Sequence, residues 1–326
     1  MMADTADRQS GAISRRAFCR SALFAAAAFH AAKPSAAAAK TVKFYKNFAP
    51  GHIGVRANQR EALEHAVKYG FDGIAPNLGE FEGKSAEEIR AWVQEMKEKR
   101  IRYGAGGLPV EFGRDEDRFA ASLARLPKQA GLLKELGVER VATWLSPGSN
   151  EFTYLQNFER HKRRLREAAK ILKDDGIRLG LEFVGPRTSR ARYRFPFIGT
   201  QIDMMELAGA IDTGNVGLLL DSWHWYTSHG TVEELHGLSA KDVVHVHVND
   251  APEGIAVDQQ IDSRRKLPVT TGVIDMKGFI NALVKIGYDG PVECEPFDEE
   301  LRKMDAAAAV QKTAESLSRL WDLITA

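Results

Sequence analysis

The chain has 326 residues, a formal net charge of +1, and 44% hydrophobic and 27% charged residues, which are ordinary values for a soluble globular protein. The balanced charge argues against a protein that binds nucleic acid through a broad basic field, so no nucleic-acid partner is expected. The length fits one large α/β domain or two smaller ones.

Residues 1–39 are predicted to be a cleaved twin-arginine signal peptide. Arg15 and Arg16 precede a weakly apolar stretch at 21–32, and the alanines at 36–39 suit a signal peptidase. The alternative interpretation is an alanine-rich tail or a first helix. Export predicts a periplasmic or secreted protein, the twin-arginine export machinery as a partner, and no membrane association after cleavage.

The rest of the chain, residues 40–326, is predicted to form one domain. It keeps a single cysteine, Cys294, because Cys19 lies in the signal, so an internal disulfide is excluded. No apolar stretch in it approaches the ~20 residues that a membrane span needs.

In chain order, short runs rich in Val, Ile, Leu and Phe alternate with stretches of helical periodicity. Strands are predicted at 42–48, 71–76, 101–106, 140–145, 177–183, 215–221, 243–249 and 291–295. Helices are predicted at 57–69, 85–100, 115–136, 154–174, 200–211, 231–239, 275–287 and 299–324. Eight strand-then-helix units without a Pro/Ser-rich linker predict an α/β fold, a single (β/α)8 TIM barrel. The alternative, an open doubly wound sheet, more often carries a glycine-rich phosphate loop after its first strand, which residues 47–52 lack.

Two connections are unusually long for a compact barrel. They span 184–200 and 249–273, and both follow the carboxyl ends of strands, where barrel enzymes build their sites. Long ordered loops of this kind are typically lids or binding loops, so we expect both to border a site.

Carboxylates and an imidazole lie at the ends of the last four predicted strands: Glu182, Asp221, His247 and Glu295. Because strand side chains alternate in direction, His245 and His247 share one face while the intervening valines take the other. The valines suit the outer face, which packs on helices, so the histidines must point into the barrel. The same parity directs Glu182, Asp221 and Glu295 inward, and the four side chains converge if the barrel closes.

Buried carboxylates aimed at one axis are costly without a cation between them. Three carboxylates and one imidazole suit Mn²⁺, Mg²⁺ or Co²⁺ in six-coordination, with open positions for substrate oxygens, and Zn²⁺ is an alternative. We predict a divalent metal ion, with Mn²⁺ as the first choice. Each residue alone also fits a structural role: His245 as a histidine that holds a carboxylate, Glu293 in an ion-pair layer, and His224 as a turn cap.

Four segments carry a resemblance to a known family: Leu181-Glu182-Phe183, Asp221-Ser222-Trp223-His224, His245-Val246-His247-Val248-Asn249-Asp250 and Glu295-Pro296-Phe297. They resemble the xylose isomerase-like TIM barrels, in particular the sugar phosphate isomerase/epimerase group. The resemblance implies that Glu182 and Glu295 act as acid and base as well as metal ligands, and that His224 contacts the substrate. The chain departs from the family at Glu253, which takes the place of a substrate-binding arginine of ketose epimerases, and at 268–272, where the usual Pro-Gly-acidic-Gly turn is replaced.

Further substrate contacts are expected from the loops and strand ends. Arg187 is predicted to clamp an anionic or polyhydroxyl substrate, whereas the other arginines of 184–200 suit a solvated surface. Trp144 and Trp223 end strands, and each either stacks on a sugar ring or packs at the barrel rim. His52, after the first strand, is a further candidate.

The predicted function is a metal-dependent sugar isomerase or epimerase that acts through an enediolate on a keto- or aldo-sugar. The alternative is a metal-dependent lyase or dehydratase that uses the same site on a keto-sugar or 3-keto-glycoside. A phosphodiesterase with a trinuclear zinc cluster needs more histidine ligands than these strand ends offer, and a sugar-binding protein without catalysis is a fourth interpretation. The expected partner is a small sugar, and the sequence leaves a homo-oligomer open.

Overall fold

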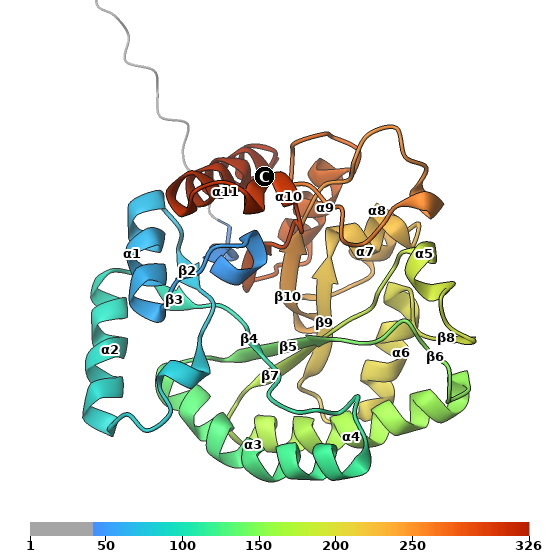
Figure 1. Ribbon diagram of the computed structural model, residues 1–326, viewed down its shortest axis with the longest axis horizontal. Coiled ribbons are helices and arrows are strands. Elements are labelled where there is room, and N and C mark those ends of the chain that lie inside the picture. Colours follow the sequence, from blue (N-terminus) through green and yellow to red (C-terminus); the bar gives the residue numbers. More distant parts are fainter. Residues whose placement is uncertain (1–41, 326) are drawn as a thin grey trace, which may run out of the picture. The chain divides into compact units, whose positions relative to one another are not determined.

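The computed structural model describes residues 42–325 (Figure 1), so the predicted signal peptide at 1–39 lies outside the described residues. A parallel sheet of nine strands runs in the order β3-β2-β1-β11-β10-β9-β7-β5-β4. Its strands are β1 (Tyr45–Phe48), β2 (Gly73–Ile74), β3 (Arg102–Tyr103), β4 (Gly106–Gly107), β5 (Arg140–Trp144), β7 (Arg178–Glu182), β9 (Val216–Asp221), β10 (Val243–Val248) and β11 (Pro291–Cys294). All eight predicted strands are present, with the third divided into β3 and β4.

The sheet closes into a barrel through this divided strand. β3 pairs with β2 and β4 pairs with β5, while Gly104 and Ala105 alone separate β3 from β4 along the chain. The two ends of the strand order therefore belong to one stretch of backbone. The first and last strands, β1 and β11, also pair in parallel. This closed ring of parallel strands confirms the predicted TIM barrel.

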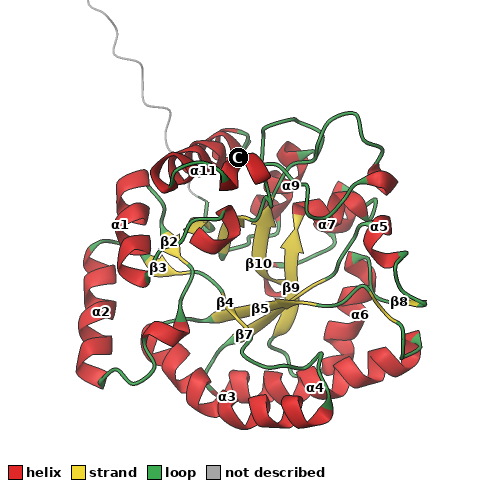
Figure 2. Ribbon diagram, viewed as in Figure 1, coloured by secondary structure: helices red, strands yellow, loops and turns green. Residues whose placement is uncertain are grey.

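Helices surround the barrel and cover its outer face (Figure 2). They are α1 (Gln59–Tyr69), α2 (Ala86–Glu98), α3 (Glu116–Leu136), α4 (Tyr154–Asp174), α6 (Gln201–Ile211), α8 (Val232–His236), α9 (Met276–Lys285), α10 (Glu299–Arg302) and α11 (Ala306–Asp322). The prediction of one helix at 299–324 is wrong, because Asp305 accepts the N–H of Ala308 and starts α11 as a separate helix. Within residues 42–325, no helix combines the length and the apolarity that crossing a bilayer requires.

The strands bury two different faces. Outward side chains such as Leu179 and Leu220 are fully buried in the main core. Ala105, Ala142 and Leu219 form a small separate cluster, as expected of residues inside the ring. Apolar side chains therefore fill part of the interior, while polar groups occupy the layer at the carboxyl ends of the strands.

The long connections carry structure that periodicity did not predict. Within 184–200 lie α5 (Arg187–Arg190) and β8 (Phe195–Pro196), and β8 pairs antiparallel with β6 (Gly148–Ser149). This pairing ties the connection after β7 to the connection after β5. Directly after β9, the Asp221 side chain accepts the N–H of Trp223 and so starts α7 (Ser222–Thr227).

Candidate metal centre

Four side chains meet at the carboxyl end of the barrel. Glu182 and Asp221 end β7 and β9, His247 lies on β10, and Glu295 follows β11. One ligand atom from each lies within 4.8 Å of the others. His247 Nδ1 is 3.5 Å from Glu182 Oε1 and 3.7 Å from Asp221 Oδ2. It is 3.3 Å from Glu295 Oε2, so the imidazole borders all three carboxylates.

This cluster fits a divalent cation. Glu182, Asp221 and His247 are buried. Within residues 42–325, Glu182 Oε1 and His247 Nδ1 are buried without a hydrogen bond of acceptable geometry. A cation between them would satisfy both atoms. Carboxylate oxygens with one imidazole nitrogen are donors that Mn²⁺, Mg²⁺, Co²⁺ and Zn²⁺ accept in proteins.

A further carboxylate, that of Glu293 on β11, orients His247. Its Oε1 lies 3.3 Å from His247 Nε2 and 3.3 Å from His245 Nε2. His52 Nδ1 is 3.1 Å away, and Asn47 on β1 donates to the second oxygen of Glu293. A carboxylate at Nε2 leaves Nδ1 of His247 facing the other three carboxylates, which is how metal-binding histidines are usually held. His245, expected to hold a carboxylate, thus contacts one that lies outside the group of four.

Asn249, directly after β10, links two of the candidate ligands. Its amide nitrogen donates to both oxygens of Asp221, at 3.2 and 3.1 Å. Its amide oxygen accepts the N–H of Glu295 at 3.0 Å. The side chain is fully buried, so water does not compete for these bonds. Sequence reasoning gave Asn249 no role, although its position two residues after His247 places it on the same face of the strand.

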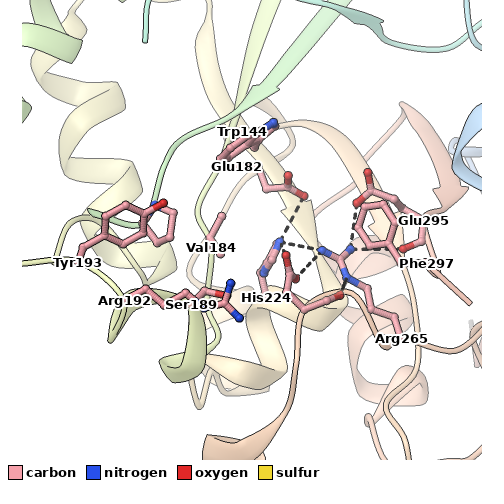
Figure 3. A pocket seen from close by; sticks show the side chains of 12 residues that line it. Trp144, Glu182, Val184, Ser189, Arg192, Tyr193, His224, Arg265, Glu295 and Phe297 are labelled. Carbon is pink, nitrogen blue, oxygen red and sulfur yellow. Dashed lines mark hydrogen bonds and ion pairs between the residues drawn. The ribbon is translucent and has the colours of Figure 1, made fainter. Parts of the chain in front are cut away.

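Arg265, from the long connection after β10, reaches into the cluster (Figure 3). Its Nη1 donates to Asp221 Oδ2 at 2.8 Å and to Glu295 Oε2 at 2.9 Å. Its Nη2 donates to Asp262 Oδ1 at 2.8 Å. Burial opposes its charge, yet the carboxylates of Asp221 and Glu295 hold the pKa of Arg265 above its ordinary value. Sequence reasoning missed Arg265, because an irregular loop has no periodicity that places a side chain.

Asp250 anchors the connection that carries Arg265. The fully buried carboxylate of Asp250 accepts five backbone N–H groups at 2.8–3.1 Å, from Ala251, Thr270, Thr271, Gly272 and Ile274. Its backbone also pairs with that of Lys266, the neighbour of Arg265, through two hydrogen bonds of 2.8 Å. Asp250 therefore fixes both ends of the loop and, through Lys266, the place of the guanidinium.

The two carboxylates implied as acid and base have different electrostatic environments. Burial raises the pKa of Glu182. Burial acts on Glu295 in the same direction, but His247 and Arg265 outweigh it and lower the pKa of Glu295 to about 2. Burial likewise favours the neutral acid at Asp221, yet Arg265 holds the pKa of Asp221 below its ordinary value. A dication at the centre would add positive charge beside Glu182 and favour its ionised form.

A cavity of about 360 Å³, here called the first cavity, adjoins the cluster (Figure 3). Its lining includes Glu182, Glu295 and Arg265, together with Trp144 and His224. His224 Nε2 lies 3.9 Å from Glu182 Oε1. The volume falls near the lower end of the range of ligand pockets, ~300–1,000 Å³, and so suits a small ligand.

Two residues predicted to contact the substrate lie outside this lining. The Trp223 indole is fully buried, and the Arg265 guanidinium lies 5.8 Å from its ring centre, so Trp223 supports that arginine. The Arg187 side chain is 69% exposed and pairs with Asp258 at 3.3 Å, which joins the two long connections. Arg192 of the same connection lines the first cavity. Substrate contact by Trp223 or Arg187 stays a prediction.

Residues 63–320 match the family described as xylose isomerase-like TIM barrel. The inosose isomerase of Bacillus subtilis is 30% identical over 148 residues, 45% of this chain, and the match spans 50% of that protein. The inosose isomerase of Bacillus velezensis is 23% identical over 80% of this chain and 91% of its own length. The 3-dehydroshikimate dehydratase of Pseudomonas aeruginosa is 27% identical over 74% of this chain, but the match spans 36% of that protein.

Solved structures share the fold. A xylose isomerase domain protein from Alicyclobacillus acidocaldarius has a TM-score of 0.76 at 28% identity, covering 86% of this chain and 99% of that one. The IOLI protein with a bound zinc atom has a TM-score of 0.72 at 23% identity, covering 87% of this chain and 100% of that one. The chain belongs to the xylose isomerase-like TIM barrel family, whose named relatives found here are enzymes: isomerases, epimerases and dehydratases.

Proposed function

We propose that the protein is a metal-dependent isomerase or epimerase that acts on a keto- or aldo-sugar through an enediolate. The observation that carries the proposal is the convergence of four side chains beside a cavity that two of them line: Glu182, Asp221, His247 and Glu295. The relatives support the reaction class, since they include inosose isomerases and the L-ribulose 3-epimerase of Mesorhizobium japonicum.

The same four side chains would hold the ion: Glu182, Asp221, His247 and Glu295. Mn²⁺ is our first choice because three carboxylates and one imidazole suit a hard six-coordinate cation, and Mg²⁺, Co²⁺ and Zn²⁺ are alternatives. A bound dication polarises a carbonyl and makes the adjacent C–H more acidic. Metal analysis after purification, followed by EDTA treatment and reloading with each ion in turn, would identify the ion that restores activity.

Glu182 and Glu295 would transfer the proton. Glu182 ends β7 and Glu295 follows β11, and two strands separate β7 from β11 in the sheet. Both side chains line the first cavity, so they face a bound sugar from different directions. One carboxylate takes a proton from carbon. Return of a proton to the other face of that carbon gives epimerisation, and return to the neighbouring carbon gives isomerisation. Arg265, which lines the same cavity, would stabilise the negative oxygen that forms.

Deuterium wash-in tests this proposal. The metal-loaded protein is incubated with a panel of keto-sugars in deuterium oxide, and exchange at carbon is followed by NMR. Glu182→Gln and Glu295→Gln keep the side-chain shape and remove the proton carrier, so each should lower kcat by ~10²–10⁴-fold. The matched control is Glu253→Gln, which neutralises an exposed carboxylate. Full turnover by the Glu295→Gln protein would refute the role of that residue.

A lyase or dehydratase is the second candidate. The 3-dehydroshikimate dehydratases of Pseudomonas aeruginosa and Pseudomonas putida align with 74% and 80% of this chain. In such a reaction one carboxylate takes the proton from carbon, and the other protonates the leaving oxygen as the C–O bond breaks. A keto-sugar then loses water, or a 3-keto-glycoside loses its alcohol. Mass spectrometry separates the candidates, because isomerisation and epimerisation conserve the mass of the sugar.

We also infer that the protein is exported to the periplasm or beyond. The inference rests on the sequence of residues 1–39, in which Arg15 and Arg16 precede an apolar stretch and small residues. Fractionation of cells that make the full chain should place it outside the cytoplasm. The double change of Arg15 and Arg16 to lysine should retain it inside, and a cytoplasmic unmodified chain would contradict the inference.

A further inference from the structure

A second cavity lies next to the first at the carboxyl end of the barrel. It has a volume of about 500 Å³ and is lined mainly by the segments that follow β4 and β5. Trp144, the last residue of β5, lines both cavities. The proposed proton transfer uses the first cavity and gives the second no role, although the second is the larger of the two.

One short segment forms the border between the cavities. Pro147 lines the first cavity, whereas Ser146, Gly148 and Ser149 line the second. The pairing of β6 with β8 fixes this segment. Trp144 is 59% exposed, so its indole is free to pack against a ligand that occupies both cavities.

Hydroxyl groups and aromatic rings line the second cavity together. Phe152 supplies an aromatic ring, and Thr143 and Ser149 supply hydroxyls. The Ser149 hydroxyl accepts the N–H groups of residues 151 and 152, which leaves its own proton for a ligand. A sugar ring matches this lining, because its hydroxyls form hydrogen bonds while its C–H faces pack on aromatic rings.

His161 adds a hydrogen-bond acceptor to the same lining. Its Nδ1 lies 2.8 Å from the carbonyl oxygen of Asn157 and donates its proton there, so Nε2 is left as an acceptor. Burial lowers the pKa of His161 to about 4, which keeps the ring neutral at pH 7. A neutral acceptor of this kind pairs with a hydroxyl.

The charged side chains of the second cavity balance one another. The lining contains two arginines, Arg114 and Arg160, and two glutamates, Glu111 and Glu151, so its formal charges cancel. Arg160 already donates to the carbonyl of Gly113 at 3.1 Å and to that of Arg114. The lining has no net charge, and the Arg160 guanidinium already donates to backbone carbonyls. The cavity therefore favours a neutral ligand over a phosphate or carboxylate.

We propose that the substrate has two linked rings, with the reacting keto-sugar in the first cavity and a second, uncharged sugar ring in the second cavity, and with Trp144 between them. The substrate class is therefore a disaccharide or glycoside. The proposal rests on the proposed function, because the reacting ring is placed at the metal centre. Binding of the second ring, remote from the reacting carbon, raises kcat/KM over that of the free monosaccharide.

Matched pairs of sugars test this proposal on the metal-loaded full-length protein. D-Fructose is compared with maltulose and lactulose, and 3-keto-D-glucose is compared with 3-ketocellobiose. Deuterium exchange at carbon and product formation are followed together. We expect the two-ring member of at least one pair to have a kcat/KM at least about tenfold higher. Equal or faster turnover of the one-ring members would overturn the proposal while leaving the proposed function intact. No exchange with any sugar would refute the proposed function and this proposal with it.

Variants locate the second ring. Phe152→Ala removes an aromatic surface from the second cavity, and Thr143→Val removes a hydroxyl with little change in shape. Each should lower the ratio of two-ring to one-ring kcat/KM by several-fold. Tyr154→Ala is the control, because this partly exposed ring lies two residues from Phe152 and outside both cavity linings. An unchanged ratio in both folded cavity variants, judged by thermal melting, would overturn the placement of the second ring.

Discussion

Replacing Asp250 by asparagine should release the connection that carries Arg265. The carboxylate of Asp250 is fully buried and accepts five backbone N–H groups, through one oxygen from 270–272 and through the other from Ala251 and Ile274. Asparagine keeps one acceptor oxygen and replaces the other by an NH2 group, which offers only donors. If the remaining oxygen accepts the N–H groups of 270–272, the N–H groups of Ala251 and Ile274 face the NH2 group and lose their acceptor.

The expected loss is large for an isosteric change. A hydrogen bond to a charged acceptor contributes about 1.5–3 kcal/mol, so two lost bonds lower the free energy of unfolding by about 3–6 kcal/mol. The total stability of a folded domain is about 5–15 kcal/mol, so the variant should be close to unfolding or should open the loop locally. In either case kcat should fall, because Arg265 loses its fixed place beside Asp221 and Glu295.

Urea unfolding measures the global loss, and proteolysis after Arg264, Arg265 or Lys266 measures local opening. The matched control is Asp258→Asn in the same connection, where the carboxylate is 43% exposed and pairs with Arg187. The control should cost less than about 1 kcal/mol, since exposed ion pairs contribute little. A loss below about 1 kcal/mol for Asp250→Asn, with the loop still protected, would refute the anchoring role.

Three further outcomes are expected. Asn249→Ala should weaken binding of the divalent ion ~10–100-fold in calorimetry, because Asp221 and Glu295 lose a shared support; unchanged affinity would contradict this. Arg265→Met should tighten ion binding to the same centre and lower turnover, since the guanidinium competes with a cation for both carboxylates; weaker ion binding would show that it does not compete. The free energy of unfolding should fall as the pH drops from about 6.5 to about 4. Burial lowers the pKa of folded His161 to about 4, so in this range His161 takes up a proton in the unfolded chain but stays neutral in the folded protein. This contribution amounts to about 3 kcal/mol and should be absent from the pH profile of His161→Gln; identical profiles for the two proteins would rule it out.

The barrel could be predicted because its signals are local and repeated. Each predicted strand is a short apolar run followed by a stretch of helical period, and eight such units leave few alternatives to a closed parallel ring. The inward direction of Glu182, Asp221, His247 and Glu295 followed from the two-residue period of strands. Side chains alternate in direction along every strand. In β10, valines alternate with histidines, which shows which positions of that strand point into the barrel.

Features that depend on contacts between distant loops could not be predicted. The antiparallel pair of β6 and β8 has two residues in each strand, too few to show a period. Arg265 occupies its place because Asp250 collects N–H groups from residues more than 20 positions away, and nothing in the loop sequence states this. Trp223 was expected either to stack on a sugar ring or to pack at the barrel rim; its indole is buried in α7, an arrangement that its position two residues after β9 did not indicate. Glu253 stands where ketose epimerases have a substrate-binding arginine, so the sequence indicated a site without that arginine. The same loop brings another arginine, Arg265, to the site from further along the chain.

The pairing of β1 with β11 has a consequence for how the protein is made. Asn47 on β1 and Glu293 on β11 form a hydrogen bond across 246 positions of sequence, and α11 packs beside α1 (Figure 1). A ribosome releases the chain from its amino end, so β1 has one unpaired edge until the residues of β11 have emerged. Closure of the ring and arrival of Glu295 then occur together. A nascent chain that stops before Pro291 therefore has neither a sealed barrel nor a complete set of metal-binding side chains, and the site is assembled only after β11 has been made.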